Sequence, residues 1–278
     1  MEKLQAALEK AREHRGTATP VPPNREKALG ATRGNTRSEQ SLSWENIPEV
    51  ALDLQHLLDH RILTSEASTD ESAGFDLLRT KIQLQMEKNG WKRLAITSPT
   101  KASGKTTVCA NVAFALSRQK SKRTIVFEMD MRRPSMAKTY GLNPARSTAD
   151  LLRGDVELED QAFRIGPDVA VSCNPQSLVS PSDLFLDPRT TEQLKRIERR
   201  FAPDLMIFDL PPIYAGDDAT AFFPNVDCVL LVAEAERCTI QQIDKSEREI
   251  AEHTNFLGVV LNKCRYPEEQ ESYGYSYT

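Results

Sequence analysis

From residue 93 onward, short apolar segments alternate with segments that have helical periodicity. The apolar segments are 93–98, 124–129, 169–173, 205–209, 228–233 and 256–262, and the helical ones are 104–118, 190–201 and 240–253. Short, almost continuously apolar strands are typical of a parallel sheet that helices cover on both faces. The sequence therefore predicts an α/β fold, and it places any active site at the carboxyl ends of the strands.

The chain before residue 93 divides into an arm and the start of the folded domain. Residues 16–44 are rich in Thr, Pro, Gly and Arg and offer little apolar surface to offset the entropy of ordering. Apolar residues over 47–60 predict a short helix, and the spacing of Phe75, Leu78, Ile82 and Met86 predicts another. We expect a disordered arm over 1–45, one domain over 46–263 and a flexible tail over 264–278.

A phosphate-binding loop is indicated between the first strand and the helix that follows. Residues 98–107 read SPTKASGKTT, with Gly104, Lys105 and Thr106 as the characteristic end of such a loop. Backbone N–H groups at a helix start attract phosphate, Lys105 would reach the β- and γ-phosphates, and the Thr106 hydroxyl would bind Mg²⁺. Pro99 stands where the pattern has its first glycine. The alternative is an ordinary loop with a surface lysine.

Acidic residues end two other strands of the predicted sheet. Glu128 and Asp130 close the segment TIVFEMD, and at two-residue spacing on a strand they share a face. Asp209 closes LMIFD, as a Walker B acid does. Carboxylates beside a phosphate loop suit a hydrated Mg²⁺, although each segment alone could be a solvated turn. Together the three strand ends predict a site for a nucleoside triphosphate with Mg²⁺.

Charge argues against a nucleic-acid partner. The chain carries 36 Lys+Arg and 40 Asp+Glu, and residues 1–40 hold 8 and 5 of these. An acidic body with a mildly basic arm lacks the positive surface that nucleic acid requires. No apolar run approaches the roughly 18–20 residues that span a bilayer, and the first residues lack a signal-peptide pattern. We therefore expect a cytoplasmic protein that meets a membrane only indirectly.

The part of the chain from about residue 70 to residue 278 resembles the cytoplasmic bacterial tyrosine kinases (BY-kinases, CpsD/CapB type) of capsule and exopolysaccharide synthesis. The loop SPTKASGKTT is similar to the family's Walker A motif, TIVFEMDMRRP to its Walker A′ motif, and LMIFDLPP to its Walker B motif. The tail YPEEQESYGYSYT resembles the family's tyrosine cluster. The Arg-Arg-Pro after the acidic motif and the tyrosine tail separate this group from the related MinD/ParA partitioning ATPases.

The resemblance implies a Mg²⁺–ATP-dependent autokinase on the P-loop fold, in which the tail of one chain enters the ATP site of a neighbouring copy. It implies nucleotide contacts from Ala102, Ser103, Gly104, Lys105, Thr106, Thr107 and Arg132. It implies catalytic roles for Lys105, Glu128, Asp130 and Asp209, metal ligation by Thr106, Asp130 and Asp209, and phosphorylation of Tyr266, Tyr273, Tyr275 and Tyr277. Asn262 would contact adenine or simply end a strand. Arg132 and Arg133 would neutralise a phosphate or pair with acids of a neighbour.

Three features depart from the family pattern. Glu128 stands where the family usually has Asp, the tyrosine cluster is short, and the Glu-x-x-Arg-x-x-Arg motif of ring assembly reads Ala73, Asp76 and Arg79. The usual partner in the family is a membrane-embedded regulator of polysaccharide chain length. The alternative hypothesis is a nucleotide-switched ATPase that assembles an export system with weak or no kinase activity.

Overall fold

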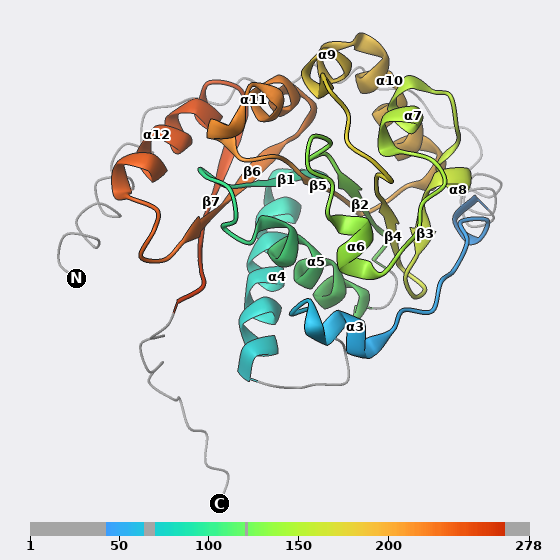
Figure 1. Ribbon diagram of the computed structural model, residues 1–278, viewed down its shortest axis with the longest axis horizontal. Coiled ribbons are helices and arrows are strands. Elements are labelled where there is room, and N and C mark those ends of the chain that lie inside the picture. Colours follow the sequence, from blue (N-terminus) through green and yellow to red (C-terminus); the bar gives the residue numbers. More distant parts are fainter. Residues whose placement is uncertain (1–42, 64–69, 120–121, 265–278) are drawn as a thin grey trace, which may run out of the picture. The chain divides into compact units, whose positions relative to one another are not determined.

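The computed structural model describes residues 43–63, 70–119 and 122–264 (Figure 1). Its strands are β1 (Arg93–Thr97), β2 (Thr124–Glu128), β3 (Phe163–Arg164), β4 (Val169–Ser172), β5 (Leu205–Asp209), β6 (Cys228–Glu234) and β7 (Asn255–Asn262). Its α-helices are α3 (Leu54–Asp59), α4 (Asp70–Asn89), α5 (Lys105–Ser117), α6 (Met136–Tyr140), α7 (Thr148–Arg153), α8 (Leu158–Gln161), α9 (Pro181–Leu186), α10 (Pro188–Phe201), α11 (Asp218–Phe222) and α12 (Ile240–Ala251). Within these ranges, no helix is both long and apolar enough to cross a bilayer.

The strands form one sheet in the order β3-β4-β2-β5-β1-β6-β7. Every neighbouring pair is parallel except β3 and β4, which pair antiparallel. The predicted mostly parallel α/β sheet is therefore confirmed, and the predicted strand bounds agree with the structure to within one residue. Among the strands of the described residues, the two-residue edge strand β3 was not predicted, because it is too short to give an apolar segment.

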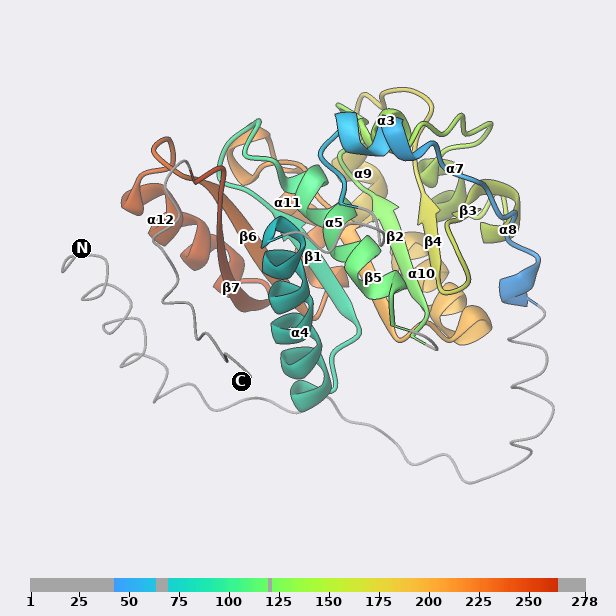
Figure 2. The ribbon, with the colours of Figure 1, turned by 90° about the horizontal axis from the view of Figure 1, so that it is seen from below.

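Helices cover both faces of the sheet, as predicted (Figures 1 and 2). Side chains alternate along each strand, so Leu94 and Ile96 of β1 pack in one apolar cluster and Ala95 packs in the other. The first cluster includes residues of α3, α4, α5 and α6, and the second includes residues of α7, α10, α11 and α12. The strands β1, β2, β4, β5 and β6 are thus buried on both faces, which explains their almost continuous apolar sequences.

Local sequence explains where the longer helices begin. Before α10, the side chain of Asp187 accepts a hydrogen bond from the Arg189 amide, and a proline occupies the first helical position. Thr239 and Gln242 form a capping box at the start of α12. The predicted helices over 104–118, 190–201 and 240–253 are confirmed as α5, α10 and α12.

The predicted helix over 47–60 is wrong for its first half. Only α3 is helical there, and Asp53 caps it by accepting from two of its backbone amides. Residues 48–50 instead run beside β3, where Arg164 N donates to Pro48 O at 2.7 Å and Val50 N donates to Arg164 O at 3.0 Å. Proline disfavours the helical conformation at the residue before it, and the edge of the sheet offers partners to an extended chain.

Residues just before this segment pack into the folded domain. Trp44 and Ile47 are buried, and Trp44 Nε1 donates to Pro167 O at 2.8 Å. The Arg123 guanidinium lies over the indole ring at 5.3 Å from its centroid. Trp44 therefore belongs to the core of the domain, at the point where the arm was expected to end. Most of that predicted arm, residues 1–42, lies outside the described part of the chain.

The helix predicted near residue 70 is confirmed as α4. Ile82 and Met86 are buried against α5 and the sheet, while Phe75 and Leu78 pack at the edge of the same cluster. Outside this apolar stripe, Asp76 forms ion pairs with Arg79 of α4 and with Arg118 after α5. Asp76 and Arg79, which stand at positions of the ring-assembly motif, therefore form ion pairs within the chain.

The connection from β1 to α5 is the loop that the sequence analysis assigned to phosphate binding. It contains two residues with left-handed backbone conformation, Ala102 at φ +64° and Gly104 at φ +86°. Glycine adopts this region freely, whereas an L-residue with a Cβ is strained there. Gly104 also lies under Asn262, because a Cβ at position 104 would fall 2.3 Å from Asn262 Nδ2. Gly104 therefore adopts its left-handed conformation without strain, whereas Ala102 is strained by its Cβ.

We predict opposite effects of two single-carbon changes in this loop. Ala102→Gly should raise the free energy of unfolding by about 0.5–1 kcal/mol, because it removes left-handed strain but adds freedom to the unfolded chain. Gly104→Ala should lower it by about 2–3 kcal/mol, because it adds strain and displaces Asn262. Urea unfolding followed by circular dichroism measures both changes.

Gly74→Ala serves as the matched control for that prediction. Gly74 lies in α4 and nothing lies within 4 Å of a Cβ added there. This variant should therefore raise the stability by about 0.5–1 kcal/mol, as alanine does in exposed helices. Equal effects of Gly74→Ala and Gly104→Ala would contradict the assigned role of the loop conformation.

Candidate nucleotide-binding site

A cavity of about 510 Å³ lies at the carboxyl ends of β1, β2 and β5. It is lined by Lys101, Ala102, Gly104, Lys105, Thr106, Thr107, Asp130, Arg132, Arg133, Ser135, Pro211, Pro212, Ala215, Asp218 and Lys263. The phosphate loop and the acidic residues therefore meet at the edge of the sheet where the parallel strands end. Hydrogen bonds hold these ends together, because Asp130 N donates to Asp209 O at 3.0 Å and Thr97 Oγ1 donates to Pro211 O at 2.7 Å.

Lys105 lies between two carboxylates at the first turn of α5. Its Nζ is 2.9 Å from Asp130 Oδ2 and 3.4 Å from Asp209 Oδ1. Lys105 and Asp130 are each 8% exposed, and Asp209 is fully buried. The structure thus brings together three residues that the sequence analysis predicted to converge on a triphosphate.

Thr106 completes this group of polar side chains. Its Oγ1 donates to Asp209 Oδ2 at 2.7 Å, and Lys105 Nζ is 3.5 Å from the same hydroxyl. Because Asp209 ends the buried strand β5 and Thr106 lies in the first turn of α5, the sheet and the helix position the two groups independently. The arrangement places a hydroxyl and a carboxylate side by side, directly next to the phosphate loop.

Burial and charge oppose each other at this cluster. Burial lowers the pKa of Lys105, but the charges of Asp209 and Asp130 outweigh it, so the pKa lies above its ordinary value and the ammonium stays charged. Burial raises the pKa of Asp209, and Lys105 and Thr106 counteract that shift. A buried carboxylate of this kind is stable only with a cation beside it, here Lys105.

The residues present fit a magnesium ion that is held together with nucleotide phosphates. The Thr106 hydroxyl and the carboxylates of Asp130 and Asp209 supply oxygen ligands, which Mg²⁺ prefers. Across the described residues, no group of three His, Cys, Asp or Glu side chains could hold a metal alone. A metal at this position would therefore need oxygen atoms from a bound nucleotide and from water, as Mg²⁺ commonly has in such sites.

Glu128 does not line the cavity, in contrast to the catalytic role expected for it. Its Oε1 accepts from the amides of Ser135 and Met136 at 2.5 and 2.6 Å. Its Oε2 accepts from the amide of Asn174 at 2.8 Å. Burial raises the pKa of Glu128, and these three amides oppose the shift. Its carboxylate instead fastens the end of β2 to the start of α6 and to the end of β4.

Arg132 lines the cavity but is engaged within the chain. Its Nε and Nη2 donate to the two carboxylate oxygens of Asp218 at 2.5 and 3.0 Å, and Nη1 donates to Val179 O at 2.8 Å. Asp218 is buried at the start of α11 and raises the pKa of Arg132. Sequence reasoning missed Asp218, because nothing in the segment Gly-Asp-Asp-Ala distinguishes a buried acid from an exposed one.

The last strand reaches over the phosphate loop. Asn262 Nδ2 donates to Ser103 O at 2.9 Å, and Lys263 Nζ donates to Ala102 O at 2.6 Å and pairs with Glu234 at 3.2 Å. Lys263 lines the cavity and was missed by the sequence analysis, whereas Asn262 and Ser103 do not line it. Ala102, Gly104 and Thr107 line the cavity as predicted. The four tail tyrosines, Tyr266, Tyr273, Tyr275 and Tyr277, lie outside the described residues.

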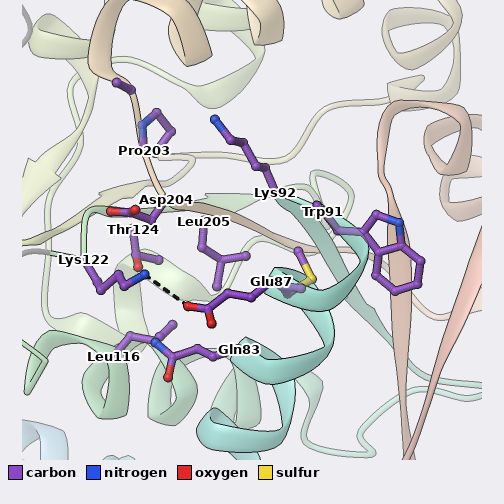
Figure 3. Close-up of a pocket in the computed structure, with 13 residues that line it drawn as sticks. Gln83, Glu87, Trp91, Lys92, Leu116, Lys122, Thr124, Pro203, Asp204 and Leu205 are labelled. Carbon is purple, nitrogen blue, oxygen red and sulfur yellow. Dashed lines mark hydrogen bonds and ion pairs between the residues drawn. The ribbon is translucent and has the colours of Figure 1, made fainter. Parts of the chain in front are cut away.

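A second cavity, of about 270 Å³, lies at the opposite ends of the strands (Figure 3). Gln83 and Glu87 of α4 line it, together with Thr124 at the start of β2 and Leu205 at the start of β5. The ion pair between Lys122 and Glu87, at 3.2 Å, lies across it. It contains no phosphate-binding loop and lies at the amino ends of β1, β2 and β5, so it does not suit a nucleotide.

We predict that Glu128→Gln lowers stability rather than nucleotide affinity. One amide N–H₂ group would replace an oxygen that now accepts hydrogen bonds, which should cost about 1–3 kcal/mol in the free energy of unfolding. The affinity for Mg²⁺–ATP should stay within about twofold of wild type, since the residue is outside the cavity. Urea unfolding and calorimetric titration test the two parts. An unchanged unfolding midpoint with a tenfold loss of affinity would restore the catalytic interpretation.

Comparison with curated proteins supports the motif assignment. The chain is 30% identical over 207 residues to the tyrosine-protein kinase Wzc of Salmonella typhi, a match that covers 71% of this chain and 28% of that protein. It is 28% identical over 203 residues to the tyrosine-protein kinase CpsD of Streptococcus agalactiae, with 72% and 86% covered. The chain thus spans little more than a quarter of the length of Wzc but most of the length of CpsD.

Solved structures show the same relationship. The kinase domain of the Escherichia coli tyrosine kinase ETK matches with a TM-score of 0.62 and 26% identity, covering 72% of this chain and 78% of that domain. The resemblance to bacterial tyrosine kinases is therefore confirmed at the level of sequence and fold. Residues 94–275 match the family model of the CobQ/CobB/MinD/ParA nucleotide binding domain. The chain accordingly belongs to the CobQ/CobB/MinD/ParA family of nucleotide-binding domains.

Proposed function

We propose that this chain is a Mg²⁺–ATP-dependent protein tyrosine autokinase that phosphorylates the tail tyrosines of neighbouring copies. The observation that carries the proposal is the placement of Lys105 within 3.4 Å of both Asp130 and Asp209 beside the phosphate loop. Phosphoryl transfer depends mainly on positioning and charge neutralisation, which such a cluster supplies. The names of Wzc and CpsD as tyrosine-protein kinases support the choice of tyrosine as acceptor.

The proposed reaction assigns roles to the residues of the cavity. The phenol oxygen forms a bond to the γ-phosphorus of ATP, the bond to the bridging oxygen of ADP breaks, and the phenol proton passes to a carboxylate. Asp130 is the acid available for that proton, because Glu128 is bound by backbone amides. Lys105 would neutralise the transferred phosphoryl group, and Thr106, Asp130 and Asp209 would hold Mg²⁺. The ion would supply charge neutralisation at the phosphates.

We further propose that the kinase acts in the synthesis or export of a capsule or exopolysaccharide. Its partner would be a membrane-embedded regulator of chain length, which would bring the protein to the inner face of the cell membrane. The resemblance to kinases of capsule and exopolysaccharide synthesis supports this assignment. Self-association between copies is part of the same proposal, because phosphorylation in trans requires one tail to reach another site.

Two observations favour the second candidate, a nucleotide-switched assembly module with little kinase activity. Glu128 does not line the cavity, so one of the two acids expected beside the phosphates is bound by backbone amides instead. Asp76 is held by Arg79 and Arg118 within the chain, which changes the helix surface that the family uses for ring assembly. Under this hypothesis, ATP would change the assembly state without producing phosphotyrosine.

A mixing experiment decides between the two functions. Lys105→Met should carry no tail phosphotyrosine when it is incubated alone with Mg²⁺–ATP, because the phosphates would lose their cation. It should become phosphorylated when mixed with a second full-length variant in which Tyr266, Tyr273, Tyr275 and Tyr277 are all phenylalanine. Mass spectrometry of tail peptides gives the readout.

The mixture also controls for misfolding of Lys105→Met, because this variant serves there only as the acceptor and needs no active site of its own. If the wild-type protein with Mg²⁺–ATP and its membrane partner gives no tail phosphotyrosine, the kinase proposal is wrong. Nucleotide-dependent changes in size that persist after deletion of residues 266–278 would then support the assembly module.

A further inference from the structure

Five cationic side chains line the nucleotide cavity, and they divide into two groups. Three of them pair with carboxylates of this chain: Lys105 with Asp130 and Asp209, Arg132 with Asp218, and Lys263 with Glu234. The other two are Lys101 and Arg133, which are exposed and form no ion pair with any described residue. The cavity therefore has two positive charges that could bind an anionic group from outside the described part of the chain.

Lys101 and Arg133 lie on different structural elements. Lys101 belongs to the phosphate loop, so a bound nucleotide would be its nearest anion. Arg133 follows the acid Asp130 in the turn after β2, and its backbone amide donates to Asp130 O at 3.2 Å. Arg133 thus follows closely after Asp130, the proposed proton acceptor, and lines the same cavity. Its neighbour Arg132 is not available to a ligand in the same way, because it donates two hydrogen bonds to Asp218.

The proposed acceptor segment carries the opposite charge. In residues 266–278, Glu268, Glu269 and Glu271 all precede Tyr273, and the segment contains no lysine or arginine. Glu271 is two residues before Tyr273, which corresponds to about 7 Å in an extended chain. An arginine beside Asp130, the proposed proton acceptor, can reach a carboxylate at that distance from the acceptor tyrosine.

We propose that Arg133 recognises the carboxylates that precede the acceptor tyrosine, so that the substrate class of this kinase is acidic tyrosine peptides. The inference rests on the proposed kinase function and specifies its acceptor. A guanidinium binds carboxylates through paired N–H groups, which gives orientation as well as attraction. Because Arg133 is exposed, its contribution is modest and weakens as salt increases.

A charge-swap experiment with full-length proteins tests this proposal. The enzyme is the variant with all four tail tyrosines changed to phenylalanine, and the acceptor is Lys105→Met with either the native tail or the tail E268K/E269K/E271K. Each acceptor is offered to the enzyme alone, to the enzyme with Arg133→Glu, and to the enzyme with Arg248→Glu. Arg248 is exposed on α12 and does not line the cavity, so it provides a matched charge reversal.

The enzyme with Arg133 should phosphorylate the native tail about three- to fivefold faster than the lysine tail. Arg133→Glu should reverse this preference, and Arg248→Glu should leave it as it was. Raising the salt concentration should reduce the preference in both directions. A reversal cannot arise from misfolding, because a misfolded enzyme would be slow on both tails.

Two results would overturn the inference while the kinase function stands. One is equal phosphorylation of the two tails by the enzyme with Arg133. The other is a loss of rate on both tails with a matching loss of ATP affinity in Arg133→Glu, which would make Arg133 a nucleotide ligand. Absence of phosphotyrosine on every acceptor would instead overturn the proposed function itself.

Discussion

The pairing of Lys105 with two carboxylates is the interaction on which the candidate site depends. A buried ammonium at the start of α5 neutralises Asp209, which ends β5, and Asp130, which lies two residues after the end of β2. Buried charges of this kind are tolerated only when they are paired, and the loss of one partner is costly. The same three side chains would surround a triphosphate. Its negative charge would compete for Lys105, and magnesium would compensate the carboxylates that Lys105 then releases.

The sheet makes this convergence possible. Lys105 and Asp209 are 104 residues apart, yet the pairing of β1 with β5 places the end of β5 beside the loop that leads from β1 to Lys105. Glu128 and Asp209 are registered partners on adjacent strands. Nevertheless, Glu128 is fastened to α6 and β4, and the backbone after β2 instead carries Asp130 toward Lys105. The role of each acid is therefore set by which donors its side chain can reach.

Much of this arrangement could be predicted from the sequence, because it depends on local patterns. Apolar segments identified the strands, and the Gly104-Lys105-Thr106 sequence identified the loop. What could not be predicted depends on contacts between distant segments. The donors that hold Glu128 come from Ser135, Met136 and Asn174, and the pairs of Arg132 with Asp218 and of Lys263 with Glu234 follow no local pattern. The extended course of residues 48–50 likewise depends on the edge of the sheet beside β3.

The most direct test is the magnesium dependence of ATP binding by calorimetric titration. We expect Mg²⁺ to increase the affinity of the wild-type protein for ATP. Asp209→Asn should bind ATP without the metal but reduce this increase by at least about tenfold. Asp218→Asn, which changes an acid that holds Arg132 rather than the metal, should keep most of the increase. An identical gain with Mg²⁺ in the wild-type protein and in Asp209→Asn would contradict convergence on one magnesium-bound triphosphate.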